Sequence, residues 1–237
     1  MIENFNNQGS QNISALGENE LAKAQLDFVS KAYGWMVAGL LTTGTIAWYM
    51  FDSGAYLYLL DSMIFLMIGT LGLVWFMSSR IDKISAQTAM ILFIVYAGLL
   101  GVTLSTVFAI YSLGSIANVF FITSGMFGAM SVYGFTAKKD LSGMGRFMFM
   151  GLVGIILASI MNIFIASSAL DMTISFIGVI VFAGLAAYDT QKIKEMYTLQ
   201  FEGSEIATKG AIMGALALYL DFINLFLFLL RFLGDRD

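Results

Sequence analysis

The chain of 237 residues is 59% hydrophobic and only 12% charged, against about 25% charged residues in a soluble domain, so we expect a polytopic protein of the lipid bilayer. Its net charge of −4 leaves no basic surface to neutralise phosphates, which excludes nucleic acid as a partner. It has no Cys and no His, so thiol chemistry is excluded and any response to pH near neutrality has to come from carboxyl groups.

Residues 1–30 are polar and rich in Asn and Gln, and they lack the basic and apolar regions of a cleavable signal peptide. We expect a cytosolic tail here, ahead of a transmembrane domain at residues 31–237. Within the tail, the spacing of Leu21, Ala24 and Phe28 is typical of a short amphipathic helix on the membrane surface. An early start of the first membrane span would give the same pattern, and both interpretations stay open.

Seven apolar segments divide the rest of the chain. Since a helix needs about 20 apolar residues to cross the hydrocarbon core, each segment is long enough to span the membrane. We therefore predict an all-α integral membrane protein with seven transmembrane helices. The predicted spans are residues 32–51, 56–77, 86–111, 116–136, 146–168, 172–191 and 210–232.

Lys and Arg occur in alternate connections, which is typical of loops retained on the cytoplasmic side. They precede the first span and follow the second, fourth and sixth, so we predict a cytoplasmic N-terminus. The C-terminus then lies on the far side although it carries Arg231 and Arg236, and we favour a full crossing of the last segment over a re-entrant one. The basic residues that set this orientation are Lys23, Lys31, Arg80, Lys83, Lys138, Lys139, Arg146, Lys192, Lys194 and Lys209.

The last predicted span carries Asp221 near its middle, with no basic residue in either neighbouring turn. A charged side chain at membrane depth costs about 2.5 to 3.5 kcal/mol on insertion scales, so such residues usually face a protein interior or mark a pathway or a proton site. Asp189 closes the preceding apolar segment, and we expect the two carboxyl groups to meet across adjacent helices. Asp189 alone could also be a helix-end residue, because Lys192 is one turn away.

The lysines that mark the charged boundary of the membrane place the two acids at different depths below it. The helical rise places Lys192 about 5 Å beyond Asp189, whereas Lys209 lies about 18 Å before Asp221. The depths agree if the last span begins outside the membrane plane, if Lys209 sits well out in the cytosol, or if the sixth span tilts.

Two carboxyl groups confined at low dielectric cannot both ionise cheaply, so we expect Asp189 and Asp221 to share a proton and to titrate as a pair. The proton would lock the sixth and seventh spans together, and its loss would favour separation of the helices or entry of a hard cation. Calcium suits oxygen-only ligands, which makes these two acids the candidate calcium ligands. Asn224 and the Tyr219 hydroxyl could extend the site. Tyr188 and Tyr219 could each donate a hydrogen bond to the neighbouring acid, and Tyr188 would equally suit an interfacial aromatic anchor.

Two stretches resemble the signature motifs of the Bax inhibitor-1 family, also called the transmembrane Bax inhibitor motif family. They are residues 187–194, which read AYDTQKIK, and residues 215–226, which read ALALYLDFINLF. The ending LRFLG at 230–234 and the stretch KKDLS at 138–142 agree with the same family, as do the number and order of the spans. The resemblance is to prokaryotic members and implies a place in the inner membrane.

What the resemblance implies is a bundle of six helices around a central C-terminal helix. It also implies a pH-sensitive calcium leak controlled by the two aspartates, with no cofactor besides the transported ion. Some relatives carry an Arg where the second span ends. Here Ser78 and Ser79 stand first, and Arg80 is the candidate latch.

Two alternatives use the same residues. In the first, the bundle conducts nothing and the polar tail binds a membrane protease or a stress-pathway protein. In the second, the pair belongs to an intramembrane aspartyl protease, whose first motif Tyr188-Asp189 would satisfy. Residues 218–221 read Leu-Tyr-Leu-Asp in place of Gly-x-Gly-Asp, and a chain without Pro cannot supply the Pro-Ala-Leu element. We therefore expect no enzyme.

Overall fold

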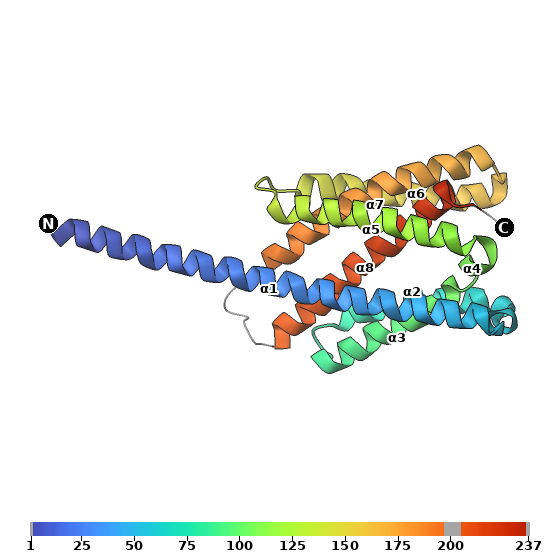
Figure 1. Ribbon diagram of the computed structural model, residues 1–237, viewed down its shortest axis with the longest axis horizontal. Coiled ribbons are helices and arrows are strands. Elements are labelled where there is room, and N and C mark those ends of the chain that lie inside the picture. The colour runs from blue at the N-terminus through green and yellow to red at the C-terminus, as the bar shows by residue number, and fades with distance from the viewer. Residues whose placement is uncertain (1, 197–204, 236–237) are drawn as a thin grey trace.

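The computed structural model describes residues 2–196 and 205–235, and it is built from helices (Figure 1). The expected all-α fold is confirmed. The helices are α1 (Ile2–Asp52), the 3₁₀ helix η1 (Ala55–Ser62), α2 (Met63–Arg80), α3 (Ala86–Leu104), α4 (Val107–Ile110), α5 (Leu113–Thr136), α6 (Ser142–Ile165), α7 (Ser168–Met196) and α8 (Glu205–Leu233).

Six helical segments in the described ranges are long and apolar enough to cross a membrane, and they match the second to seventh predicted spans. The first predicted span, 32–51, lies inside α1 and is not one of the six. The third predicted span is broken between α3 and α4 at Ser105, whose hydroxyl donates to the Val102 carbonyl at 2.6 Å. The six segments are Ala55–Arg80, Ala86–Ile110, Leu113–Thr136, Ser142–Ile165, Ser168–Met196 and Glu205–Leu233.

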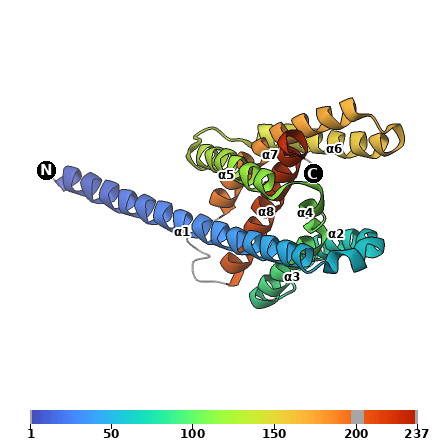
Figure 2. The same ribbon diagram turned by 45° about the vertical axis from the view of Figure 1, so that its right-hand side comes forward.

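α1 is one continuous helix, so the expected boundary between a polar tail and a first span is not a break in the backbone. Phe28 and Val29 are buried, and Leu21 and Ala24 pack partly against the core. Part of this segment therefore packs on the bundle, and both interpretations of it stay open. The N-terminal part of α1 extends away from the bundle (Figures 1 and 2).

α8 is the most buried of the six segments: 67% of its most apolar stretch is buried, against 50% for α7 and 6% for α6. It packs against α7, α1, α5 and α3, whereas α6 packs on α7 and α2 packs on α3. α8 also runs obliquely, from beside α3 at one end to beside α7 at the other (Figures 1 and 2). Each residue of an oblique helix advances less along the bundle axis than a residue of an upright helix does. The inclination of α8 therefore reduces the difference in depth expected between Asp189 and Asp221.

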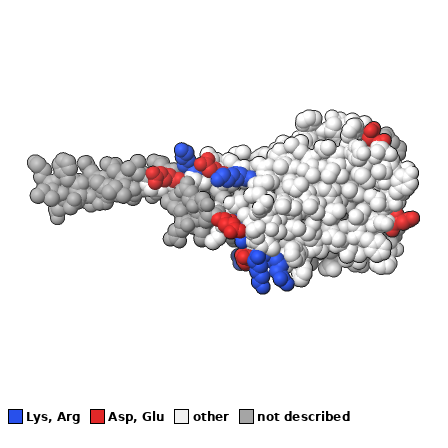
Figure 3. Space-filling view, turned by 90° about the horizontal axis from the view of Figure 1, so that it is seen from below, with Lys and Arg blue, Asp and Glu red and all other residues white. Residues whose placement is uncertain are grey.

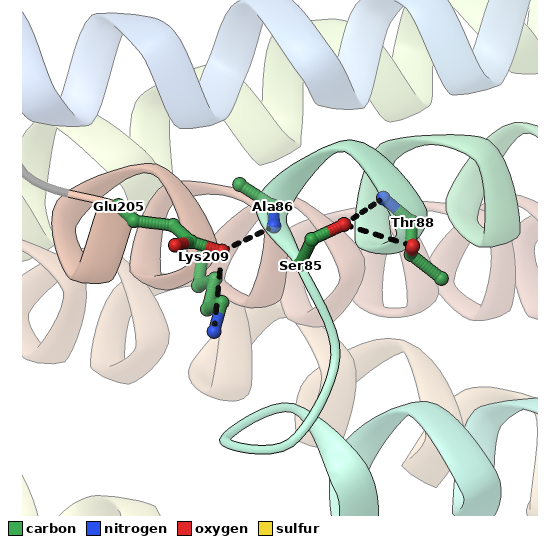
Figure 4. A network of polar contacts seen from close by, with 5 residues as sticks. All are labelled: Ser85, Ala86, Thr88, Glu205 and Lys209. Atoms are coloured by element: carbon green, nitrogen blue, oxygen red, sulfur yellow. Dashed lines mark hydrogen bonds and ion pairs between the residues drawn. The ribbon is translucent and has the colours of Figure 1, made fainter.

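The first turn of α8 is tied to the first turn of α3 (Figure 4). Glu205 accepts a hydrogen bond from the Ala86 amide at 2.9 Å and lies 3.5 Å from the Lys209 ammonium. Ser85 caps α3 by accepting a hydrogen bond from the Thr88 amide at 3.1 Å. The first amides of a helix have no partner within the helix, and these contacts satisfy amides of α3. Through Glu205 they also fix the start of α8.

The last turn of α8 is tied to the opposite end of the bundle. Arg231 forms an ion pair with Asp171 in the first turn of α7, at 3.3 Å. The Asp235 amide donates to the Ser115 hydroxyl at 2.9 Å. α8 is therefore an uninterrupted helix that reaches from one end of α7 to the other, which agrees with a full crossing and not with a re-entrant segment.

The surface between the two ends is apolar. Figure 3 shows a broad band without charged side chains, with Lys and Arg gathered where α1 leaves the bundle and only acidic residues at the far end of this face. Large exposed hydrophobic side chains cover the peripheral helices α2 and α6, as a lipid-facing surface requires. Examples are Phe65, Leu71, Trp75, Phe147, Ile163 and Phe164.

Gly134 marks the closest approach of α5 to α7. A Cβ added there would lie 2.8 Å from the carbonyl carbon of Ala187 and closer still to its oxygen. Such contacts do not occur between real atoms, so the two backbones can approach this closely only because residue 134 has no side chain.

Replacing Gly134 by Ala is expected to push α5 away from α7 and to lower the free energy of unfolding by about 1–3 kcal/mol, the usual cost of overpacking. Thermal unfolding of the purified protein in detergent measures the change. Gly125→Ala is the matched control, because Gly125 lies in the same helix and an added Cβ would meet nothing within 4 Å. Equal stability of the two variants would contradict the close contact.

Candidate functional site

The structure brings Asp189 of α7 and Asp221 of α8 together. Their side chains line the same groove and lie close enough for the charges of the two groups to interact. Asp221 is only 5% exposed, and its Oδ2 has no hydrogen-bond partner among the residues that the structure describes. A carboxylate only accepts hydrogen bonds, so a hydrogen bond between two carboxyl groups requires a proton on one of them.

A groove of about 860 Å³ leads to this pair between α6, α7 and α8. Asp189, Asp221 and Asn224 are its acidic and amide groups, and Arg146 and Lys192 are its basic groups. The remaining lining is mostly apolar: Gly145, Phe149, Met150, Leu152, Ile156, Phe182, Leu185, Tyr188, Ala217 and Leu220.

Tyr219 turns away from the acid pair. Its hydroxyl lies 2.6 Å from Thr43 Oγ1, and the Thr43 hydroxyl donates to the Ala97 carbonyl at 2.8 Å. Because Thr43 has a single hydroxyl proton, Tyr219 is the donor to Thr43. Tyr219 is fully buried and links α8 to α1 and α3 instead of extending a site at Asp221.

Tyr33 makes a similar hydrogen-bonded link from α1 to α7, beside the acid pair. Its hydroxyl lies 2.7 Å from Thr190 Oγ1, and the Thr190 hydroxyl donates to the Ala186 carbonyl at 2.7 Å. Tyr33 is therefore a donor, and it lies close enough to Asp221 for the charges of the two groups to interact. The sequence analysis missed Tyr33, since its partner Thr190 is 157 residues away and its only signal was a tyrosine within an apolar segment.

The other predicted site residues divide between the groove and the surface. Asn224 lines the groove, and its amide group donates to the Leu220 carbonyl of its own helix at 2.8 Å. Tyr188 forms a wall of the groove, where its ring leaves no room for a side chain at Gly145. Arg80 is exposed at the end of α2, a helix that packs on α3, and the structure does not bring it to the pair.

The described residues contain no group of three or more Asp, Glu, His or Cys side chains that could hold a metal ion. Two carboxyl groups with one nearby amide are fewer oxygen ligands than the six to eight that calcium takes. The described residues therefore do not form a site that would retain calcium permanently.

Comparison with known proteins identifies the family. The sequence profile described as inhibitor of apoptosis-promoting Bax1 matches residues 25–237, which include every groove residue. The chain belongs to the Bax inhibitor-1 family. It is 49% identical over 220 residues to the inner membrane protein YbhL of Escherichia coli K12, across 88% of this chain and 92% of YbhL.

Two further relatives are uncharacterised proteins. One, from Borreliella burgdorferi, is 46% identical over 213 residues, across 88% of this chain and 92% of the relative. The other, from Rickettsia prowazekii, is 46% identical over 212 residues, across 88% of this chain and 89% of the relative. The chain is thus an integral membrane protein of the Bax inhibitor-1 family, similar along most of its length to a protein named for the inner membrane.

Two residues of the first signature stretch of the Bax inhibitor-1 family hold the connection between α5 and α6. Gln191 is buried, donates to the Lys139 carbonyl at 2.9 Å and accepts from the Leu141 amide at 2.7 Å. Lys194 donates to the Phe135 carbonyl at 2.9 Å. The sequence analysis assigned no role to Gln191 and counted Lys194 only among the basic residues that set the orientation, although both lie in the stretch that carried the resemblance.

Replacing Gln191 by Leu is expected to lower the free energy of unfolding by about 1–3 kcal/mol, because a buried amide and carbonyl lose their partners. Hydrogen exchange at the Leu141 amide should also become faster, since that amide donates to Gln191. Both quantities can be measured on the purified protein, with Gln87→Leu, an exposed position in α3, as the control. Unchanged exchange at Leu141 would show that the contact does not hold the connection.

Proposed function

We propose that this protein is a pH-sensitive leak channel for calcium, gated by Asp189 and Asp221. The proposal rests on one observation, the proximity of two carboxyl groups in one groove, of which Asp221 is almost fully buried. Family membership and the groove that reaches the pair from one end of the bundle support it.

In the closed state, one proton is shared between the two carboxyl groups and joins α7 to α8. Beyond the pair, α8 presents Phe222, Leu225 and Leu229, all buried and apolar. An ion that enters the groove therefore reaches the pair as the last polar layer before a packed hydrocarbon region. Charge cannot cross such a region cheaply, so the leak is shut.

When the shared proton leaves, two negative charges face each other at low dielectric. Their repulsion favours separation of α7 and α8, and their combined charge favours entry of a divalent cation. The closed form holds one more proton than the open form, so acid stabilises the closed form and neutral or alkaline pH stabilises the open form.

Calcium is the cargo in this mechanism and not a resident cofactor. Carboxylate oxygens suit a hard cation, and the amide oxygen of Asn224 can supply one more ligand. Because so few protein oxygens are available, calcium keeps much of its water and is released easily. No catalytic step is involved: an aspartyl protease would need motifs that residues 218–221 lack.

The same proposal includes an arrangement in the membrane. The first predicted span, within α1, and the other five apolar segments surround α8, and the end that carries most of the Lys and Arg residues faces the cytoplasm, so that α1 begins there. The groove then opens to the cytoplasm, and the Arg231–Asp171 ion pair lies near the far surface.

In proteoliposomes, calcium efflux of the wild type is expected to rise from acid to neutral pH. Asp221→Asn and Asp189→Asn should each remove this dependence, because an amide neither binds nor releases the gating proton. Asp82→Asn, at an exposed acid in the connection between α2 and α3, is the control and should retain it. If Asp221→Asn keeps the pH profile of the wild type, the gate is rejected.

A second candidate function is favoured by α1, whose N-terminal part extends beyond the bundle (Figure 1). Such a segment could bind a membrane protease or a stress-pathway protein while the bundle conducts nothing. Deletion of residues 1–19 separates the two functions. The pH-dependent calcium flux should survive the deletion, and loss of flux together with retained folding would contradict the assignment of the leak to the bundle.

A further inference from the structure

Two basic side chains belong to the lining of the groove. Arg146 projects from the second turn of α6 and Lys192 from the end of α7, and both are exposed and line the groove. Neither forms an ion pair in the described part of the chain. Lys192 lies over the ring of Tyr188, 5.7 Å from its centre, and its charge acts on Asp189.

The nearest acid to Arg146 on the connection between α5 and α6 is Asp140. Hydrogen bonds from Ser142, with the Arg146 charge as a weaker contribution, hold the pKa of Asp140 below its usual range. Asp140 is therefore ionised near neutral pH, but its carboxylate is engaged by the Ser142 amide at 2.8 Å. The guanidinium of Arg146 keeps its donors for another anion.

Beneath these two cations, the groove is apolar and open along one side. Its wall follows α6 from Arg146 to Ile156, ten residues or about 15 Å of helix. Phe149 and Met150 on its rim are 60% and 63% exposed, so the groove opens onto the lipid-facing surface of α6. Its volume of about 860 Å³ falls in the range of pockets that enclose small ligands, roughly 300–1,000 Å³.

A ligand that fits this groove has an anion at one end and an apolar chain of about 15 Å at the other. The membrane around the groove supplies such a molecule. We propose that the groove binds an anionic phospholipid, whose phosphate is held by Arg146 and Lys192 and whose acyl chain lies against Phe149, Ile156 and Leu220. Arginine binds phosphate in a bidentate manner, and basic pockets between membrane helices bind anionic headgroups.

Snorkelling alone does not explain the arrangement. It would bring each basic side chain to the headgroup level separately, without a groove below. Here two cations from two helices line one mostly apolar groove that also contains the acid pair. The bound chain would exclude water from that groove and would compete with an ion for the same space. The inference depends on the groove and its rim and not on ion conduction, so it stands or falls independently of the proposed leak.

Native mass spectrometry of the purified full-length protein tests the proposal. Phosphatidylglycerol and phosphatidylcholine with identical acyl chains are titrated separately, and the wild type should retain phosphatidylglycerol at about tenfold lower concentration, since each basic group near a headgroup contributes to binding. Arg146→Ala with Lys192→Ala should abolish the preference. Lys138→Ala with Lys139→Ala removes two exposed charges from the neighbouring connection without changing the groove lining, and should retain it.

Two further experiments test where the acyl chain binds and whether the bound phosphate belongs to a lipid or is a free anion. Ala217→Phe fills the groove beneath the cations and should reduce retention of both lipids, with thermal unfolding as the check on folding. Millimolar inorganic phosphate should not displace phosphatidylglycerol, because a free anion lacks the chain. The proposal is overturned if the Arg146 and Lys192 double variant keeps the wild-type preference, or if inorganic phosphate alone competes.

Discussion

The proximity of the carboxyl groups of Asp189 and Asp221 inside the bundle is the constraint on which the rest of this structure depends. It places a titratable contact between α7 and α8, the two most buried of the six apolar segments, and the Oδ2 atom of Asp221 has no partner among the residues that the structure describes. A buried oxygen without a partner is costly. The gain or loss of one proton therefore changes the balance between attraction and repulsion of α7 and α8. The apolar surroundings that make this contact costly also make it sensitive to protonation.

The bundle holds the surroundings of this contact in place. Both ends of α8 are tied, through Glu205 to the start of α3 and through Arg231 to the start of α7. Between them, two hydroxyl chains with the same chemistry cross the bundle, one from Tyr219 and one from Tyr33, each ending on a backbone carbonyl. A response of the acid pair is therefore expected as a local opening beside the groove and not as a general loosening of the bundle.

The sequence predicted the spans, whose positions are set by the bilayer. It missed the features that depend on how the helices are rotated and tilted relative to one another. Seven spans were predicted because a hydrocarbon core demands long apolar segments, and six of them match the apolar segments of the structure. The break at Ser105 was missed because its hydrogen bond is local and leaves the hydropathy unchanged. The direction of Tyr219 could have been predicted, since two residues correspond to about 200° around a helix and place it opposite Asp221. The partner of Tyr33 and the inclination of α8 could not, because both depend on how distant helices pack.

The shared proton itself can be observed by infrared spectroscopy of the purified protein during a pH titration. We predict a carbonyl band of a protonated carboxyl group that is present in acid, disappears as the pH rises to neutrality, and is missing at every pH in Asp221→Asn. A wild-type spectrum that is identical to that of Asp221→Asn throughout the titration would contradict the shared proton, and with it the gate.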